Sequence, residues 1–317
     1  MQNLLSHFAP GRRLKVVIDT DTYNEIDDQF ALVYALLSPD RMAVEAIYAA
    51  PFENSRVASY AEGMELSFQE ILRVIGLLGL GGAGQVFRGA TCRISEHGDS
   101  GSAASSDLIR RAQALPDGER LVVIAIGAAT NVAAALATAP EISEKIVLLW
   151  LGGHPSHWPH NREFNLRGDP EAVRIILKSN VPFGLFPCAT VAEALTTTVS
   201  ELAPNLKGRG EIGDYLFDIF ANYDHENLQA IAASKTIWDL APFAWAIEPE
   251  WFDVRETIRP DLSEDLSWKN GDTQETLLEA IRLQRDPIFR DFFSKIQAFK
   301  EGRIVARMVD PGLKRMI

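Results

Sequence analysis

Acidic side chains crowd one short stretch near the start of the chain. The apolar run 16–18 predicts a buried parallel strand, and the apolar spacing after residue 28 is that of a helix. Asp19-Thr20-Asp21, Glu25 and Asp27-Asp28 lie at this strand-to-helix corner. Such corners are where open α/β sheets bind ligands, and carboxylates this close repel one another unless a hard cation compensates them. The alternative is a solvated acidic turn that complements the helix dipole, and the DxD-then-DD pattern favours the metal site.

Three other segments carry polar residues at predicted strand ends. The apolar run 121–126 leads into Gly127-Ala128-Ala129-Thr130-Asn131, and the run 145–151 leads into a polar loop from Gly152 to Asn165. Asp239 stands in an apolar surround just before a helical pattern. Because the carboxyl ends of parallel strands share one edge of a sheet, we expect these groups to converge on one site with the acidic corner.

Strand-like and helix-like segments alternate, which is typical of an α/β fold with a largely parallel central sheet flanked by helices. We expect one domain over residues 1–317, with 1–13 as an N-terminal extension and 261–317 as a mostly helical C-terminal part. The polar loop 89–106 is expected to lie over the site. The glycine cluster 79–84 predicts a turn, because it lacks the features of a P-loop. The other predicted strands are 42–49, 86–88, 182–186 and 252–258. A long helix is predicted at 56–78, interrupted at Gly63, and an alanine-rich helix ends at Pro140. Further predicted helices are 170–179, 211–222, 227–234, 240–247 and one within 276–299 that is perturbed at Pro287.

Composition limits the classes of function. A chain of 317 residues with 47% hydrophobic residues can bury a large core. The formal net charge of −12 argues against binding to nucleic acid, and a small-molecule substrate fits better. Cys92 and Cys188 form no CxxC pair, so no disulfide framework is implied. The sequence shows neither a signal-like segment nor an apolar run of membrane-spanning length, so we expect a cytoplasmic protein without membrane partners.

Taken together, these motifs resemble those of the inosine-uridine preferring nucleoside hydrolase family, the calcium-dependent nucleoside N-ribohydrolases. That family has a strand followed by DTDxGxDD, a GxxTN strand end, a GG loop leading to EFN and DPEA, and a late aspartate before a helix. The order and spacing of these motifs match over roughly residues 14–250, and the chain resembles a divergent member of the family. The matching segments are Asp19-Thr20-Asp21 with Asp27-Asp28, Gly127 to Asn131, Gly152-Gly153 with Glu163-Phe164-Asn165, Asp169-Pro170-Glu171-Ala172, and Trp238-Asp239.

The resemblance implies the single-domain nucleoside hydrolase-like α/β fold, a bound Ca²⁺, and hydrolysis of the N-glycosidic bond of a ribonucleoside to free base and ribose. It also implies a homodimer or homotetramer. Position by position, Asp21 is the general base on the attacking water and a metal ligand, and the other metal ligands are Asp28, the backbone carbonyl of Thr130, and Asp239. Asp27, Glu163 and Asn165 are expected to bind ribose hydroxyls, and Asp19 to support the loop by hydrogen bonds.

Elementary chemistry agrees with these roles. Calcium takes roughly six to eight oxygen ligands, which carboxylates, a carbonyl, water and a vicinal diol supply. Holding the sugar diol fixes the anomeric carbon for attack. Carboxylates beside the ring also stabilise the positive charge of an oxocarbenium-like transition state.

Three departures from the family pattern affect the interpretation. The acidic loop is two residues longer, so Asn24 and Glu25 either add oxygens near the cation or extend the turn, and we favour the turn. The Gly-Asn that usually follows the second strand is missing, and Asn54 is the expected substitute for binding the sugar. Trp238 stands where the family often has a histidine that protonates the leaving group. An indole cannot act as an acid near neutral pH, so Trp238 either stacks on the nucleobase or belongs to the core.

The loop 154–160 contains three histidines, His154, His157 and His160, at intervals of three residues. Zinc ligation is one interpretation, but two prolines and the lack of a helix argue against it. A second interpretation places His157 or Trp158 at the leaving-group pocket, where a histidine could donate a proton. The third is an ordinary mobile loop. His225, between two acidic residues, predicts a solvated position at a helix start.

Two other functions stay open. The start of the chain also resembles haloacid-dehalogenase-type phosphatases, but the neutral strand end 127–131 lacks their later acidic pair. The second alternative is a nucleoside-binding homologue that has lost catalysis through the altered loop and Trp238. We favour the hydrolase, because a binding protein need not keep Asp21, Asp28, Thr130 and Asp239 together.

Overall fold

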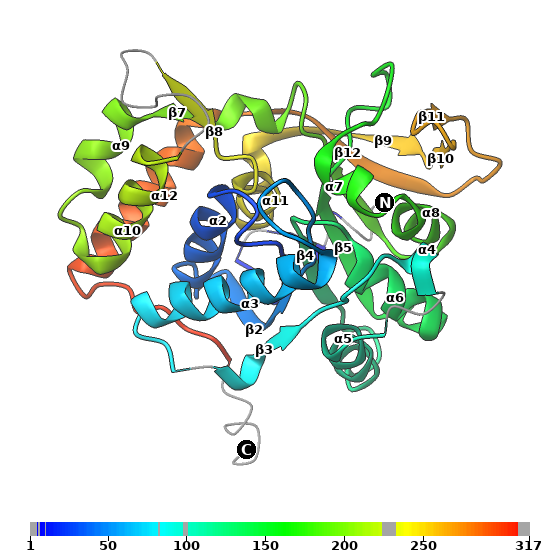
Figure 1. The fold of residues 1–317 in the computed structure, drawn as a ribbon, viewed down its shortest axis with the longest axis horizontal. Coiled ribbons are helices and arrows are strands. Elements are labelled where there is room, and N and C mark those ends of the chain that lie inside the picture. The colour runs from blue at the N-terminus through cyan, green and yellow to red at the C-terminus, as the bar shows by residue number, and fades with distance from the viewer. Residues whose placement is uncertain are drawn as a thin grey trace.

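A central sheet of eight strands organises the computed structural model, which describes residues 5, 7–9, 11–81, 83–97, 101–223 and 233–309 (Figure 1). The strand order is β3-β2-β1-β4-β5-β6-β12-β9, and every neighbouring pair is parallel except β12 and β9. The expected α/β fold with a largely parallel sheet flanked by helices is confirmed. The strands are β1 (Leu14–Thr20), β2 (Met42–Ala49), β3 (Val86–Arg88), β4 (Leu121–Ala125), β5 (Ile146–Leu151), β6 (Phe183–Phe186), β9 (Phe252–Ile258) and β12 (Thr276–Leu283).

Both faces of the sheet are covered by helices, which explains why the strands are continuous apolar runs rather than alternating ones. Along β1, Val16 and Ile18 pack into one hydrophobic core, and Val17 packs into the other. The first core lies under α2 (Asp27–Leu36), α3 (Tyr60–Leu77), α9 (Val199–Leu206), α10 (Gly210–Ala221), α11 (Leu240–Ile247) and α12 (Arg285–Lys300). The second lies under α5 (Ala103–Gln113), α6 (Thr130–Thr138) and α8 (Pro170–Lys178) (Figure 1).

Local signals account for most helix limits. The Ser59 side chain accepts a hydrogen bond from the Glu62 N–H and caps α3, so this helix starts later than predicted. Gly63 does not interrupt α3; it sits inside the helix, where an added Cβ would lie 2.0 Å from the Phe52 carbonyl oxygen. The glycine there serves close packing. Gly79, directly after the helix, has a φ of +72°, as expected for a glycine turn.

Two predictions for later segments are wrong. Residues 276–283 form strand β12, whose Leu277 and Leu278 are buried on opposite faces of the sheet, and only 285–300 is helical. The part from residue 261 on is therefore not mostly helical. It also contains the short hairpin of β10 (Asp261–Leu262) and β11 (Trp268–Lys269). Pro287 lies in the first turn of α12, where its missing N–H costs no helical hydrogen bond.

The predicted loop 89–106 is shorter than expected, because α4 (Ile94–His97) and the start of α5 fall within it. His225 and residues 227–232 of the helix predicted at 227–234 lie outside the described residues, and Ser234 lies in a strand rather than a helix. Next to this gap, β7 (Thr196–Thr198) pairs with β8 (Ser234–Thr236) as a small antiparallel sheet.

The N-terminal segment is tied to the domain by Arg41, whose side chain is buried beside the first strands. Its guanidinium donates hydrogen bonds to the carbonyl oxygens of Phe8 and Ala9, at 2.6 and 2.8 Å, and of Arg12. A further bond of 2.8 Å reaches the Ala246 carbonyl in α11. One side chain thus joins three parts of the chain that are far apart in sequence.

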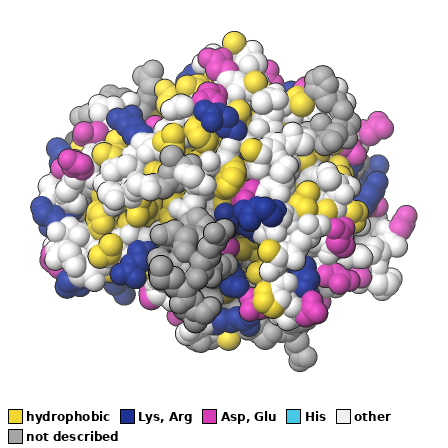
Figure 2. Space-filling model, turned by 90° about the horizontal axis from the view of Figure 1, so that it is seen from below, with side chains coloured by type: hydrophobic (Ala, Val, Ile, Leu, Met, Phe, Trp, Pro, Cys, Tyr) yellow, Lys and Arg dark blue, Asp and Glu magenta, His cyan; other side chains and the backbone are white. Residues whose placement is uncertain are grey.

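Within the described residues, no helix combines the length and apolar character that a bilayer crossing requires. On the face shown in Figure 2, Lys and Arg side chains lie scattered among acidic and hydrophobic ones. This scatter differs from the continuous basic stripe that nucleic-acid binding uses.

Candidate active site

The acidic corner folds into a buried turn between β1 and α2. The N–H of Asn24 donates a hydrogen bond of 2.7 Å to the carbonyl oxygen of Asp21, which closes this turn. Asp27 and Asp28 occupy the first turn of α2, where the helix dipole favours negative charge. Asp21, Asp27 and Asp28 are each at most 3% exposed, so the corner is no solvated turn.

A cluster of carboxylates forms where this corner meets Asp239, the residue before α11. Oxygens of Asp27, Asp28 and Asp239 lie within 4.8 Å of one another, and Asp239 shares hydrogen bonds with both other residues. Thr20 Oγ1 donates a bond of 2.5 Å to Asp28. Two carboxylates in contact require a proton or a cation between them.

Burial sets the electrostatics of this cluster. It raises the pKa of Asp28 to about 8, with the neighbouring Asp27 adding to the effect, and it raises the pKa of Asp27 to about 6. Burial, followed by repulsion from the other aspartates, raises the pKa of Asp21 and of Asp239 well above the usual range. Asp21 Oδ2 is buried without a hydrogen-bond partner. An all-oxygen set with an unused buried oxygen fits a hard divalent cation, which would offset this repulsion.

The end of β4 brings the backbone up against Asp21. At Gly127 an added Cβ would lie 2.8 Å from Asp21 Oδ1, so only glycine leaves room for the carboxylate. The residue before it, Ile126, has its carbonyl oxygen 3.0 Å from Asn165 Nδ2, which donates to it. The same Asn165 nitrogen donates to the Leu151 carbonyl at the end of β5, at 3.1 Å. Asn165 therefore ties two strand ends together beside the cluster.

Glu163 caps α7 (Phe164–Gly168) from the loop that follows β5. Its carboxylate accepts hydrogen bonds from the N–H groups of Asn165 and Leu166, both at 2.9 Å, and of Gly153 at 2.7 Å. Burial nevertheless raises the pKa of Glu163. These contacts hold the carboxylate in one orientation.

Asp19 lies behind this first layer, as predicted for a supporting residue. It is fully buried, and its Oδ1 accepts a bond of 2.8 Å from Asn131 Nδ2. Asn131 Oδ1 in turn accepts from the N–H of Ala90 at 2.8 Å. Burial raises the pKa of Asp19 to about 7.

These groups line a cavity of about 290 Å³, which we call the carboxylate cavity. Seven of the predicted site residues line it: Asp21, Asp27, Asp28, Glu163, Asn165, Trp238 and Asp239. Residues that sequence reasoning did not assign to the site also line it, among them Ile126, His154, Arg162 and Cys188. Two of these residues could have been found from the sequence, because they stand next to motif residues: Ile126 precedes Gly127, and Arg162 precedes Glu163.

Three predicted residues lie elsewhere. The Thr130 hydroxyl bonds Asp169 Oδ2 at 2.9 Å and the Tyr60 hydroxyl at 3.0 Å, and Thr130 is not among the lining residues described. His157 is exposed and is not among the lining residues described, whereas His154 is, so the role of His157 stays a prediction. The three loop histidines form no metal-binding group among the described residues.

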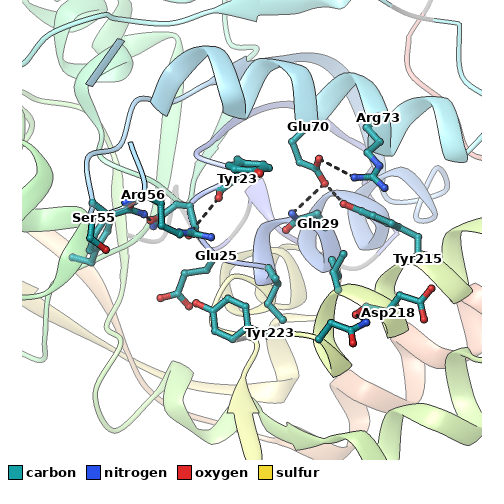
Figure 3. A pocket seen from close by; sticks show the side chains of 16 residues that line it. Tyr23, Glu25, Gln29, Ser55, Arg56, Glu70, Arg73, Tyr215, Asp218 and Tyr223 are labelled. Atoms are coloured by element: carbon teal, nitrogen blue, oxygen red, sulfur yellow. Dashed lines mark hydrogen bonds and ion pairs between the residues drawn. The ribbon is translucent and has the colours of Figure 1, made fainter. Parts of the chain in front are cut away.

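Asn54 lines a second, larger cavity of about 790 Å³ that adjoins the first through Asn24, Glu25 and Phe164 (Figure 3). Asn54 Nδ2 donates a bond of 3.0 Å to Asn24 Oδ1, so the lengthened acidic loop forms the wall between the two cavities. In Figure 3, Tyr23, Tyr215 and Tyr223 surround this space, and Glu70 accepts hydrogen bonds from Gln29 and Tyr215.

Known proteins are similar to this chain in sequence and in fold. The sequence pattern of the inosine-uridine preferring nucleoside hydrolases matches residues 16–277. The non-specific ribonucleoside hydrolase RihC of Escherichia coli O139:H28 is 23% identical over 270 residues, covering 77% of this chain and 82% of that protein. The pyrimidine-specific ribonucleoside hydrolase RihA of Klebsiella pneumoniae is 26% identical over 279 residues, with the same coverage.

Among solved structures, a plant nucleoside hydrolase superposes with a TM-score of 0.70 at 20% identity, covering 90% of this chain and 100% of that one. This similarity supports the fold. The sequence match spans β1 to the start of β12 and includes every segment that lines the carboxylate cavity. The chain therefore belongs to the inosine-uridine preferring nucleoside hydrolase family, and is a hydrolase acting on the N-glycosyl bonds of ribonucleosides.

Proposed function

We propose that the carboxylate cavity binds a calcium ion and the ribose of a ribonucleoside, and that Asp21 activates the water that attacks the anomeric carbon. The observation that supports this most strongly is the buried cluster of Asp27, Asp28 and Asp239, together with the buried Asp21, which these carboxylates repel and which carries an unpartnered oxygen. Such a cluster is costly without a cation, because buried carboxylates repel one another.

Asp21, Asp28 and Asp239 are the proposed side-chain ligands. For the backbone ligand we propose Ile126 in place of Thr130, because Ile126 lines the cavity and the Thr130 hydroxyl bonds Asp169 and Tyr60. A carbonyl oxygen has two lone pairs, so the Ile126 oxygen keeps one after accepting from Asn165. The bound ion would supply Lewis acidity toward water and a positive charge for the sugar diol.

Ribose recognition falls to Asp27, Glu163 and Asn165, as the sequence predicts. Asn165 Nδ2 donates both of its protons, one to the Ile126 carbonyl and one to the Leu151 carbonyl. Its Oδ1 therefore remains to accept a hydrogen bond from a sugar hydroxyl. Glu163 is fixed by three backbone N–H groups: Oε2 accepts from both Gly153 and Leu166, and Oε1, which accepts from Asn165, keeps acceptor capacity. Fixed acceptors of this kind also stabilise a developing positive charge on the ring.

The leaving-group side lacks a strong acid among the described lining residues. Burial and the neighbouring His160 lower the pKa of His154, which therefore stays neutral at pH 7. Burial raises the pKa of Tyr223 to about 12, so this phenol is a poor proton donor as well. Trp238 offers a stacking surface for the base, and we propose that the leaving base takes its proton from solvent.

The test is base release from a panel of purine and pyrimidine ribonucleosides, with and without a calcium chelator. Chelation should stop turnover, and calcium should restore it. Asp21→Asn keeps the side-chain size but removes the base, and we expect turnover to fall by about a thousandfold. Asp40→Asn, on an exposed turn at the opposite edge of the sheet, is the matched control. Chelator-resistant turnover, or full activity of Asp21→Asn, would reject this assignment.

The oligomeric state can be measured on the same purified protein. We propose a homodimer or homotetramer, as the resemblance implies, and light scattering after size-exclusion chromatography measures the mass directly. A monomer would contradict it. The single domain over 1–317 and the cytoplasmic location stay predictions, and one cooperative unfolding transition would be the expected signature of a single domain.

A further inference from the structure

We propose that Glu25 is a specificity-determining residue, which favours nucleobases with an exocyclic amino group over those with a carbonyl group at the same position. The inference deepens the proposed function and rests on it, since it assumes that the ribose binds at the carboxylates and that the base stacks on Trp238. Glu25 belongs to the lengthened acidic loop between β1 and α2, and its side chain lines both cavities. Neither the metal ion nor the ribose uses this carboxylate in the proposed mechanism.

The two cavities meet at Glu25. Within the described part of the chain, the residues that line both of them are Asn24, Glu25 and Phe164, and Glu25 is the charged one. Its side chain is 39% exposed, so a ligand can reach the carboxylate. A nucleoside that extends from the proposed metal ligands toward the larger cavity therefore passes Glu25.

An ion pair holds Glu25 on the side of the carboxylate cavity that carries Trp238. Lys235 Nζ contacts Glu25 Oε2, and it lies 4.5 Å from the centre of the Tyr223 ring. Lys235 is part of β8 and precedes Trp238 by three residues. Figure 3 shows Glu25 and Tyr223 together on one side of the larger cavity. Because one short segment places both Glu25 and Trp238, we expect a base stacked on the indole to present an edge to the carboxylate.

The Glu25 carboxylate keeps one oxygen for a ligand. Oε2 is paired with Lys235, whereas Oε1 accepts no hydrogen bond from any other described residue. The Lys235 side chain is 11% exposed, so the ion pair lies mostly out of solvent, where the attraction between the charges is stronger. A carboxylate accepts hydrogen bonds and donates none. Glu25 therefore presents an acceptor to the space between the two cavities.

The loop around Glu25 is held in place as well. Asn54 Nδ2 donates a hydrogen bond of 3.0 Å to Asn24 Oδ1, and the Arg56 guanidinium donates to the carbonyl oxygens of Tyr23, at 3.3 Å, and of Asn24. These contacts join the loop to the segment after β2, and the ion pair joins it to β8. An acceptor that is arranged before the ligand arrives loses less entropy on binding than a mobile one.

A fixed acceptor distinguishes bases by the group opposite the glycosidic bond. In cytosine and adenine this group is an amino group, which donates hydrogen bonds, whereas in uracil and hypoxanthine it is a carbonyl oxygen, which only accepts them. The group lies far from the sugar, so it is the part of the base that reaches the boundary between the cavities. An amino group there gains a charge-assisted hydrogen bond, and a carbonyl oxygen faces another acceptor. Sites that use a hydrogen bond in this way reject the analogue that lacks it.

The experiment compares kcat/KM for adenosine with that for inosine, and for cytidine with that for uridine, with calcium present and base release as the readout. Glu25→Gln keeps the side-chain size, but its amide can also donate to a carbonyl oxygen. We expect each ratio of amino to carbonyl substrate to fall by about tenfold in this variant, the loss expected for one charge-assisted hydrogen bond. Comparing the ratios of wild type and variant cancels the different intrinsic reactivity of the bases.

Glu144→Gln is the matched control. Glu144 is exposed just before β5, at the opposite edge of the sheet, and the same change in charge there should leave both ratios unchanged. A merely structural role of Glu25 would lower kcat/KM for all four nucleosides alike, and would not move the ratios.

Two outcomes separate this inference from the proposed function. If nucleosides are hydrolysed, but neither ratio falls in Glu25→Gln, the role of Glu25 is wrong and the hydrolase stands. If no nucleoside is hydrolysed, calorimetry with calcium-loaded protein decides. A ratio of cytidine to uridine affinity that falls in Glu25→Gln supports the role of Glu25, and an unchanged ratio or absent binding overturns it.

Discussion

Gly127 offers a direct test of how the strand ends position Asp21, the proposed catalytic carboxylate. Its φ lies outside the left-handed region, so alanine suits the backbone there, and the effect of Gly127→Ala is purely steric. The new methyl group would lie 2.8 Å from Asp21 Oδ1 and 3.0 Å from its Cγ. On its other side the Ala50 Cβ is 3.1 Å away, which limits escape in that direction.

The size of the effect follows from these distances. Ordinary contact for a Cβ begins at 3.4 Å, so the Asp21 carboxylate must move by about 0.6 Å. A displacement of about 1 Å of a reacting group costs on the order of a hundredfold in rate. We therefore expect kcat/KM to fall by about tenfold and the calcium dependence to shift to higher concentration, because Asp21 is both base and ligand in the proposed mechanism.

The assay is base release from the best nucleoside at a series of calcium concentrations, together with thermal unfolding. Gly76→Ala is the matched control: Gly76 lies exposed in α3 with nothing within 4 Å of an added Cβ. It should stabilise the protein by roughly 0.5–1 kcal/mol and leave turnover intact. Wild-type kcat/KM and calcium dependence in Gly127→Ala would refute the placement of Asp21 against this strand end.

Three further predictions concern packing, the base and pH. Gly63→Ala drives a methyl group into the Phe52 carbonyl, and should lower the free energy of unfolding in urea by about 3 kcal/mol or more; a loss as small as that of a surface substitution would contradict the close approach. Trp238→Ala should lower kcat/KM by about tenfold if the indole stacks on the base, whereas Trp238→Phe should keep most of it; equal losses in both would indicate a core role. Burial lowers the pKa of His7 from 6.5 to about 4. Between these pH values the unfolded chain binds a proton on this histidine that the folded chain does not, so the free energy of unfolding falls as the pH drops from 6.5 to 4. In His7→Gln this fall should be less steep, as measured by urea unfolding at each pH, and an identical slope would show that His7 is not buried as described.

The acidic corner shows what sequence alone can predict. An apolar run followed by DxD and DD restricts Asp21, Asp27 and Asp28 to one strand-to-helix turn, whatever the rest of the chain does. Strand ends of a parallel sheet must share an edge, so Asn165, which follows β5, could be placed there without coordinates. Asp239 follows β8, which pairs with β7 outside the central sheet, so that rule does not place it. The alternation of elements likewise gave the sheet, because every crossover needs a helix.

Contacts that depend on packing escaped prediction. Residues 276–283 contain good helix formers, but their place between β6 and β9 makes them a strand, which tertiary packing decides. Which histidine of the loop 154–160 meets the cavity depends on how Glu279 and Trp268 anchor that loop from distant strands. The pattern GxxTN begins at Gly127, so it gave no reason to consider Ile126, the residue before it, which lines the cavity.

Arg41 has a practical consequence for handling this protein. Its buried guanidinium draws three of its four acceptors from residues 8–12, although the pattern that defines the family begins only at residue 16. Trimming the chain to the family limits would remove three of these four hydrogen bonds, and hydrogen bonds to charged groups contribute about 1.5–3 kcal/mol each. Recombinant versions that start near residue 14 should therefore be poorly expressed, and an affinity tag should be added without removing residues 8–12.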